Sequence, residues 1–239
     1  YVYKKGGFIT SFMGDAFIAL FPEDTLCALA AADLILREFE KQHIKKTKYG
    51  DFKVSVKIGL AYGKIKWGII GKSKELSYYF RGEAIQACSK AEKYCKSMDT
   101  VLDINIAEMA RDKAGLILKP ITAGLYKMKK TEKSLADCCE DKKFKSDECL
   151  SEFIPDSFSG KKIIDELRDI VCIYIFFKET EMDSDGIADF YCALSGIVRK
   201  WGGHFNNLDF GDKGGAVLLK FGIPVSYEKN IYRAFNCIN

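Results

Sequence analysis

The residues with the clearest capacity for chemistry are two Gly-Asp pairs, each lying between two apolar segments. In the first, GGFITSFMGDAFIALFP, Asp15 follows Gly14 at the expected tip of a hairpin whose strands are rich in aromatic and β-branched residues. An aspartate in a tight turn often only accepts hydrogen bonds from the backbone amides of that turn. A charge at the tip of an otherwise apolar hairpin therefore needs an explanation, which is either structural or functional.

The second pair, Gly211-Asp212, lies in a stretch that repeats the order of the first. Residues 202–224, GGHFNNLDFGDKGGAVLLKFGIP, again give Gly-Gly, strand, Gly-Asp, strand, Phe and Pro. The two Gly-Gly pairs begin at residues 6 and 202 and are thus 196 residues apart, far more than the roughly 20–50 residues of solenoid or propeller units. A degenerate repeat at this distance indicates two tandem domains.

Hydrophobic periodicity predicts the elements that must position the first pair. Asp24 is the expected N-cap of an amphipathic helix, which then runs to about His43. The remaining elements predicted for this half are a strand, turn and strand over 8–21, an exposed loop over 45–51, a hairpin over 52–71, a strand over 76–82, a helix over 83–97, a strand over 100–105 and a helix over 106–112.

The second half repeats this α+β pattern after a charged stretch without periodicity, 127–162, which we interpret as an exposed connector. A strand is predicted over 169–177 and a helix over 185–201, followed by the Gly-Asp hairpin and the start of another helix. We therefore expect three regions: 1–128, the C-terminal portion of a first domain; 129–160, a charged linker; and 161–239, the N-terminal portion of a second domain. The chain is expected to be a fragment.

Composition narrows the class of protein. The chain has 239 residues, of which 48% are hydrophobic and 29% charged, which is ordinary for a globular protein. Its apolar runs are far shorter than the roughly 20 residues that span a bilayer, so no transmembrane segment is expected. The nine cysteines lack paired spacing and there are only two histidines, which predicts reduced cysteines, no zinc site and a cytoplasmic location. The net charge of +4 is ascribed to dispersed lysines, not to a surface that binds nucleic acid.

Five segments carry a resemblance to a known family; in chain order they are GGFITSFMGDAFIALF, VSVKIGLAYGKIKWGIIG, YYFRGEAIQACSKAE, FIPDSF with DELRDIVCIYIFF, and GGHFNNLDFGDKGGAVLLKFGIPVSYE. Together they resemble the class III nucleotidyl cyclases, and in particular the soluble bicarbonate-type adenylyl cyclases with two cyclase domains in tandem. The resemblance implies an α+β fold of two ferredoxin-like cyclase domains, both partial here, each with an antiparallel sheet and helices on one face.

The implied activity is the conversion of ATP to 3′,5′-cyclic AMP and pyrophosphate, a phosphoryl transfer in which two Mg²⁺ or Mn²⁺ ions stabilise the attacking and leaving oxygens. By this resemblance Asp15 is a catalytic, metal-binding aspartate, and the second such aspartate belongs on a strand preceding Tyr1. Phe12, Gly14 and Asn207 are assigned to the substrate site. The implied partners are ATP and the two cyclase domains, which pair within one molecule; no nucleic acid is expected.

The sequence departs from the family pattern in the second half. Asn207 stands where the family has a lysine that reads adenine, so the positive charge is lost although an amide donor remains. An apolar residue, near Phe176 or Phe177, occupies the position of the first metal aspartate, and the second half is therefore not expected to bind metal. These departures leave the choice between ATP and GTP open.

The cations that bind bicarbonate in the related enzymes are also missing, because their positions fall at about Ser11 and Ser89. Weak or absent bicarbonate activation is expected. The alternative to an enzyme is a catalytically silent cyclase-homology module that binds nucleotide or regulates a larger protein. We expect cyclase activity, that of a phosphorus-oxygen lyase, from the full-length protein and none from these 239 residues alone.

Overall fold

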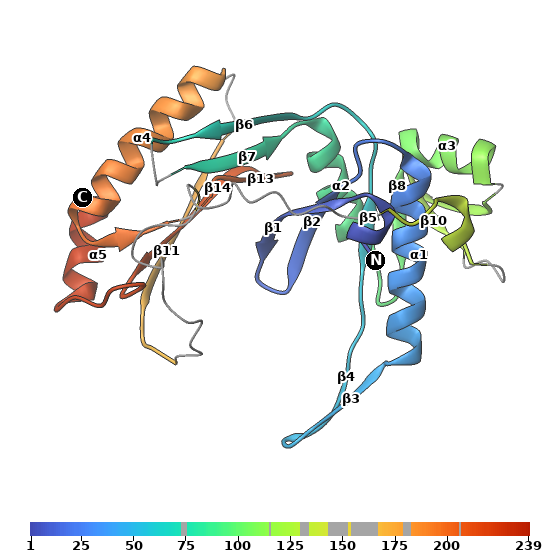
Figure 1. The fold of residues 1–239 in the computed structure, drawn as a ribbon, viewed down its shortest axis with the longest axis horizontal. Coiled ribbons are helices and arrows are strands. Elements are labelled where there is room, and N and C mark those ends of the chain that lie inside the picture. Colours follow the sequence, from blue (N-terminus) through green and yellow to red (C-terminus); the bar gives the residue numbers. More distant parts are fainter. Residues whose placement is uncertain are drawn as a thin grey trace. The chain divides into compact units, whose positions relative to one another are not determined.

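Contacts within the chain divide the computed structural model into two units, shown as a ribbon in Figure 1. Unit 1 comprises Tyr1–Ile65 and Gly82–Lys145, and unit 2 comprises Lys66–Arg81 and Ser146–Asn239. The structure describes residues 1–72, 76–114, 116–129, 134–142, 153, 167–178, 183–205 and 207–239. Most of the predicted linker, 129–160, thus lies outside the described residues. Among the described helices, none is long and apolar enough to cross a membrane.

Unit 1 is an α+β assembly around a four-stranded sheet of order β5-β8-β10-β9. Strands β5 and β8 are parallel, whereas the other neighbours are antiparallel, so the expected wholly antiparallel sheet is wrong at this pair. The elements are η1 (Tyr3–Lys5), β1 (Phe8–Met13), β2 (Ala16–Leu20), α1 (Thr25–Lys41), β3 (Ile44–Thr47), β4 (Gly50–Lys53), β5 (Ile58–Leu60), α2 (Glu83–Lys93), β8 (Thr100–Asp103), α3 (Ile104–Ala114), β9 (Leu118–Thr122), β10 (Leu125–Met128) and η2 (Ala136–Cys138).

Helix α1 begins where the sequence predicted. The Asp24 carboxylate accepts a hydrogen bond from the backbone N–H of Leu26 at 2.9 Å, which satisfies one of the free amides of the first turn. Residues 27–33 of the helix are buried. Leu29 packs with Leu102 of β8 and Ile106 of α3 in the main apolar cluster of the unit.

The hairpin predicted over 52–71 is wrong. Its first half, β5, pairs with β8, and its second half, β6 (Lys66–Ile70), pairs with β7 (Ser77–Arg81) in unit 2. The residues between them are held by side chains instead of forming a two-strand turn: Tyr62 N–H donates to Asp103 Oδ1 at 3.3 Å and Lys64 N–H donates to Glu83 Oε1 at 3.1 Å.

The exposed loop predicted over 45–51 is also wrong, because these residues lie in the two-stranded hairpin β3–β4. The Thr47 hydroxyl accepts from Tyr49 N–H at 3.1 Å and donates to the carbonyl of Gly50 at 3.0 Å. Gly50 has a φ of 126°, which side chains other than glycine rarely allow. The turn chemistry of this short stretch therefore closes a hairpin.

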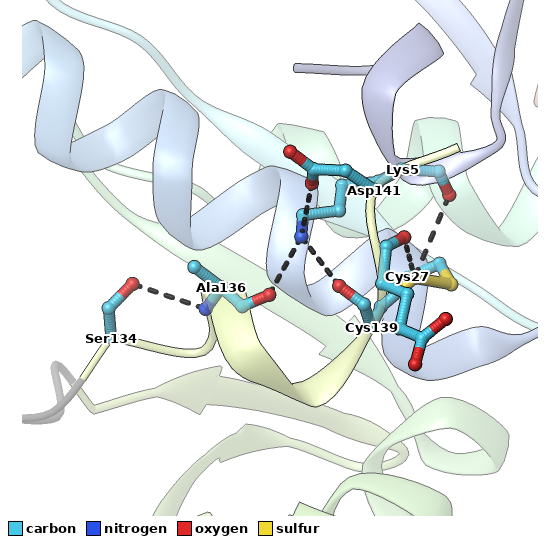
Figure 2. Close-up of polar contacts among 7 residues, drawn as sticks. Lys5, Cys27, Ser134, Ala136, Cys139 and Asp141 are labelled. Carbon is cyan, nitrogen blue, oxygen red and sulfur yellow. Dashed lines mark hydrogen bonds and ion pairs between the residues drawn. A yellow bond between two sulfur atoms is a disulfide. The ribbon is translucent and has the colours of Figure 1, made fainter. Parts of the chain in front are cut away.

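Part of the predicted connector is packed onto unit 1. The Lys5 side chain is buried, and its ammonium group donates to the carbonyls of Ala136 at 2.7 Å and Cys139 at 2.6 Å and pairs with Asp141 at 2.8 Å (Figure 2). Because a buried ammonium needs several acceptors, this cluster ties 136–141 to the start of the chain. The prediction of an exposed connector is therefore wrong for Cys139, which is buried, whereas residues 137, 138, 140 and 141 are exposed as predicted.

A disulfide joins Cys27 of α1 to Cys139 (Figure 2). The prediction of nine reduced cysteines is therefore wrong, and cysteine usage no longer supports the predicted cytoplasmic location. The two residues are 112 apart in sequence, so no local spacing could have indicated the pair. Burial raises the pKa of the Cys88 thiol to about 12 and that of Cys95 to about 11, so these two thiols stay protonated at neutral pH and pack as small apolar residues.

Unit 2 is an α+β assembly in which β14 lies between β11 and β12, and β13 also pairs with β14; all these pairs are antiparallel. If β11, β12 and the β13–β14 hairpin are counted as strands one, two and three, strand three lies between strands one and two. This is the strand order at the start of a ferredoxin-like fold. The predicted second-half strand, helix and Gly-Asp hairpin are confirmed. The elements besides β6 and β7 are β11 (Val171–Phe177), α4 (Ser184–Lys200), β12 (Gly203–His204), β13 (Asp209–Gly211), β14 (Gly214–Phe221) and α5 (Asn230–Ile238).

The core of unit 2 lies between one face of β14 and helix α4. Alternate residues of β14, Val217, Leu219 and Phe221, have no exposed surface, as the two-residue period of a strand requires. They form one cluster with residues of α4 and with Ile70 and Tyr79 of the β6–β7 hairpin. That hairpin thus groups with the second half of the chain, although the sequence assigned it to the first domain.

Candidate functional site

The first Gly-Asp pair forms the tip of the hairpin β1–β2. Phe12 pairs with Phe17 and Met13 with Ala16, which leaves Gly14 and Asp15 as the two turn residues. Gly14 has a φ of 65°, a conformation that favours glycine at a two-residue hairpin turn. The strand, turn and strand predicted over 8–21 are therefore confirmed.

Asp15 presents its carboxylate at the surface of this tip. The residue is exposed, and within the described part of the chain its carboxylate makes no hydrogen bond or ion pair. The backbone-capping role common for aspartate in turns is thus not seen. Phe12 and Phe17 flank the tip, 69% and 43% exposed, with their ring centroids 5.9 Å apart. The arrangement offers one hard oxygen donor beside an exposed aromatic pair.

Thr10 fixes the base of the same hairpin. The pairing register shifts between Ile9 and Ser11, and the Thr10 hydroxyl donates to the carbonyl of Ile18 at 3.2 Å. Thr10 is only 5% exposed. A bulge of this kind increases strand twist and aims the side chains beyond it, and sequence reasoning did not detect it.

The second Gly-Asp pair also lies at a hairpin tip, but one residue further from the turn, because Gly211 is a paired strand residue and the turn residues are Asp212 and Lys213. Gly211 pairs with Gly214, so Asp212 lies in the β13–β14 turn. Phe177 of β11 lies opposite Gly215, where a Cβ would stand 2.1 Å from the Phe177 ring. That ring also contacts Phe210, with centroids 6.0 Å apart. Phe177, one of the two apolar residues expected near the metal-aspartate position, thus packs against the core of unit 2, whereas the other, Phe176, is exposed.

Asn207 is held by a residue that sequence reasoning missed. The hydroxyl of Ser77, at the start of β7, donates to Asn207 Oδ1 at 3.3 Å. Ser77 is 3% exposed and Asn207 is partly buried. With its carbonyl oxygen accepting this bond, Asn207 presents its NH₂ group as the donor end of the amide. The two residues are 130 apart in sequence, so only the tertiary structure brings them together.

The residues assigned to the site are distributed over both units: Phe12, Gly14 and Asp15 lie in unit 1 and Asn207 lies in unit 2. Among the described residues, no group of three or more histidine, cysteine, aspartate or glutamate side chains could hold a metal ion. Asp15 fits a divalent ion in chemical type, since Mg²⁺ prefers carboxylate oxygens, and it could supply one ligand of such a site.

Comparison with known proteins gives two sequence relatives. The chain is 33% identical over 98 residues to an adenylate cyclase of Anabaena cylindrica and 30% identical over 97 residues to the terminal-differentiation-specific adenylate cyclase of Dictyostelium discoideum. These regions cover 39% and 38% of this chain. The chain spans 20% and 4% of the length of these relatives. No protein-family model matches the chain.

Solved structures with a likeness to this chain include the guanylate cyclase domain of RhGC from Catenaria anguillulae in complex with GTP and the adenylyl cyclase CyaB from P. aeruginosa. The first has a TM-score of 0.44 and 18% identity, covering 52% of this chain and 73% of that domain. The second has a TM-score of 0.40 and 15% identity, covering 55% and 76%. The sequence matches to two adenylate cyclases confirm the resemblance seen in the ordered motifs: over somewhat more than a third of its length, this chain is similar to adenylate cyclases.

Proposed function

We propose that this protein is a nucleotidyl cyclase, with ATP as its substrate and 3′,5′-cyclic AMP and pyrophosphate as its products. The observation that carries the proposal is the exposed Asp15 carboxylate, which has no partner among the described residues, at a Gly-Asp hairpin tip in a chain similar to adenylate cyclases. The reaction is intramolecular: the ribose 3′-oxygen attacks the α-phosphorus, the bond to the β-phosphate oxygen breaks, and the 3′-hydroxyl proton is released.

Asp15 would hold a divalent metal ion, and two such ions would supply charge stabilisation at the attacking and leaving oxygens. Phe12 and Gly14 flank that carboxylate, and Gly14 leaves the tip open, because no atom of the described residues lies within 4 Å of the place where a Cβ would stand. Asn207 would donate from its NH₂ group to an acceptor on the purine, and Ser77 orients it by binding its other end. Pairing of the two cyclase domains within one molecule would bring these contributions together.

A catalytically silent cyclase-homology module is the second candidate. It is favoured by Asn207, which stands in place of the lysine that recognises adenine in related enzymes. It is also favoured by the apolar residues Phe176 and Phe177 near the expected position of a metal aspartate, of which Phe177 packs against the core of unit 2. In this case the protein would bind nucleotide without converting it, and its role would be regulatory.

An activity assay separates the two candidates. We expect the purified full-length protein to convert ATP to cyclic AMP in the presence of Mg²⁺ or Mn²⁺, as measured by chromatography of the products. Residues 1–239 alone are expected to give no product. Absence of any cyclic nucleotide from the full-length protein with ATP or GTP, under conditions in which it binds either nucleotide, would establish the silent module.

Asn207→Lys tests whether the residue at position 207 recognises the purine base of the substrate. A lysine restores a charged donor, and charge-assisted hydrogen bonds are roughly twice as strong as neutral ones. We expect the ratio of kcat/KM for ATP to that for GTP to rise by roughly tenfold. Ser77→Ala is the companion variant: it removes the hydroxyl that orients Asn207 and should lower that ratio in the wild-type background only. An unchanged ratio in Asn207→Lys would exclude Asn207 from base recognition.

A further inference from the structure

The β3–β4 hairpin is the most exposed element of unit 1. Every residue from Lys41 to Lys53 is exposed, and the hairpin extends past the end of α1 (Figure 1). Three apolar side chains are nevertheless found on it: Ile44 is 50% exposed, Tyr49 80% and Phe52 52%. Large apolar side chains gathered on one projecting element indicate a surface that meets a partner.

Positive charge is concentrated on this hairpin and on the residues that flank it. Residues 41–57 contain six lysines and one aspartate, a net charge of +5, whereas the whole chain carries +4. The other residues of the chain therefore sum to a net charge of −1. The sequence-based interpretation of the charge as dispersed lysines is therefore wrong for this segment, where six lysines lie within 17 residues.

Each exposed apolar side chain of the hairpin has a lysine as its neighbour. Ile44 pairs across the strands with Lys53 and Phe52 pairs with Lys45, and cross-strand partners lie on the same face. At the tip, the Lys48 ammonium lies 4.9 Å from the centroid of the Tyr49 ring. Apolar and cationic groups are thus paired on both faces and at the end of the hairpin.

We propose that the β3–β4 hairpin binds the surface of membranes that contain anionic phospholipids. Apolar side chains such as Tyr49 and Phe52 enter the boundary between headgroups and acyl chains, while lysine side chains extend to the lipid phosphates and carboxylates. Electrostatic attraction and apolar insertion supply two separate contributions, which stable peripheral binding needs. This proposal is independent of the cyclase activity, because it uses none of the residues assigned to that site.

The residue types favour a membrane surface over nucleic acid. Residues 41–57 contain no arginine, and arginine is the residue whose planar fork binds phosphates and guanine bidentately. Lysine is a point charge on a flexible stem and suits a fluid layer of headgroups whose positions are not fixed.

Vesicle flotation with residues 1–239 tests the proposal. We expect the chain to float with vesicles of phosphatidylcholine containing about 30% phosphatidylserine, and not with phosphatidylcholine alone. Each lysine near an anionic surface contributes about fivefold in affinity, so K45E/K46E/K48E should weaken binding by roughly 100-fold or more. Y49S/F52S should weaken binding by roughly tenfold without changing its salt dependence.

The matched control is K96E/K119E/K213E, which changes the net charge equally at exposed lysines outside the hairpin. This variant should retain most of the binding, and circular dichroism should show all variants folded. Equal loss in both triple variants would overturn the proposal in favour of general electrostatic attraction. Absence of binding by the wild-type chain would overturn it too, as would tighter binding to duplex DNA, or to an acidic protein, that K45E/K46E/K48E abolishes.

Discussion

Replacing Asp15 by asparagine is expected to abolish cyclase activity in the full-length protein without unfolding it. The substitution keeps the size and the turn preference of the residue but removes its negative charge, and therefore a hard oxygen ligand for a divalent ion. Loss of such a ligand in phosphoryl transfer removes several kcal/mol of transition-state stabilisation, so kcat should fall by at least roughly 100-fold. Initial rates at saturating ATP and metal measure the effect.

Asp212→Asn is the control, because Asp212 lies in the β13–β14 turn of unit 2, in a half of the chain that is not expected to bind metal. It should leave kcat within about twofold of the wild-type value. The thermal unfolding of the Asp15→Asn protein should match that of the wild type, since the Asp15 residue is exposed. A melted domain in Asp15→Asn would instead show that the carboxylate stabilises the turn.

Phe221→Ala should destabilise unit 2 by about 3–5 kcal/mol, the usual cost of removing a fully buried phenylalanine and leaving a cavity. Phe221 has no exposed surface, and its ring lies 2.7 Å from the place where a Cβ would stand on Gly203, across the β12–β14 pair. Both tryptophans of the chain, Trp67 and Trp201, lie in unit 2. Their fluorescence during urea unfolding therefore reports the stability of this unit alone.

Phe176→Ala on the neighbouring strand β11 serves as the control for this prediction, because the same residue type is there 60% exposed. The free energy of unfolding of the Phe176→Ala protein should differ from that of the wild type by less than about 1 kcal/mol. Equal effects of the two substitutions would contradict the assignment of the buried face of the sheet.

Local sequence determined the elements that carry the candidate site. The Gly14-Asp15 and Gly211-Asp212 hairpins, the Asp24 cap and the helix over residues 184–200 follow from glycine conformations, side-chain capping and hydrophobic periodicity. Each of these depends on interactions between residues only a few positions apart, which a single sequence displays directly. The departure at Asn207 was visible for the same reason, because it is a change of residue type within an ordered motif.

Tertiary structure alone decided which distant residues meet. Strand β5 joins β8 in parallel, Ser77 holds Asn207, and Lys5 and Cys27 tie down the segment around Cys139. The partners in each of these contacts are about 40 to 134 residues apart. Periodicity contains no information about such pairs, because backbone hydrogen bonding and burial can be satisfied by several alternative partners. The free energy of the whole packed unit selects among those partners.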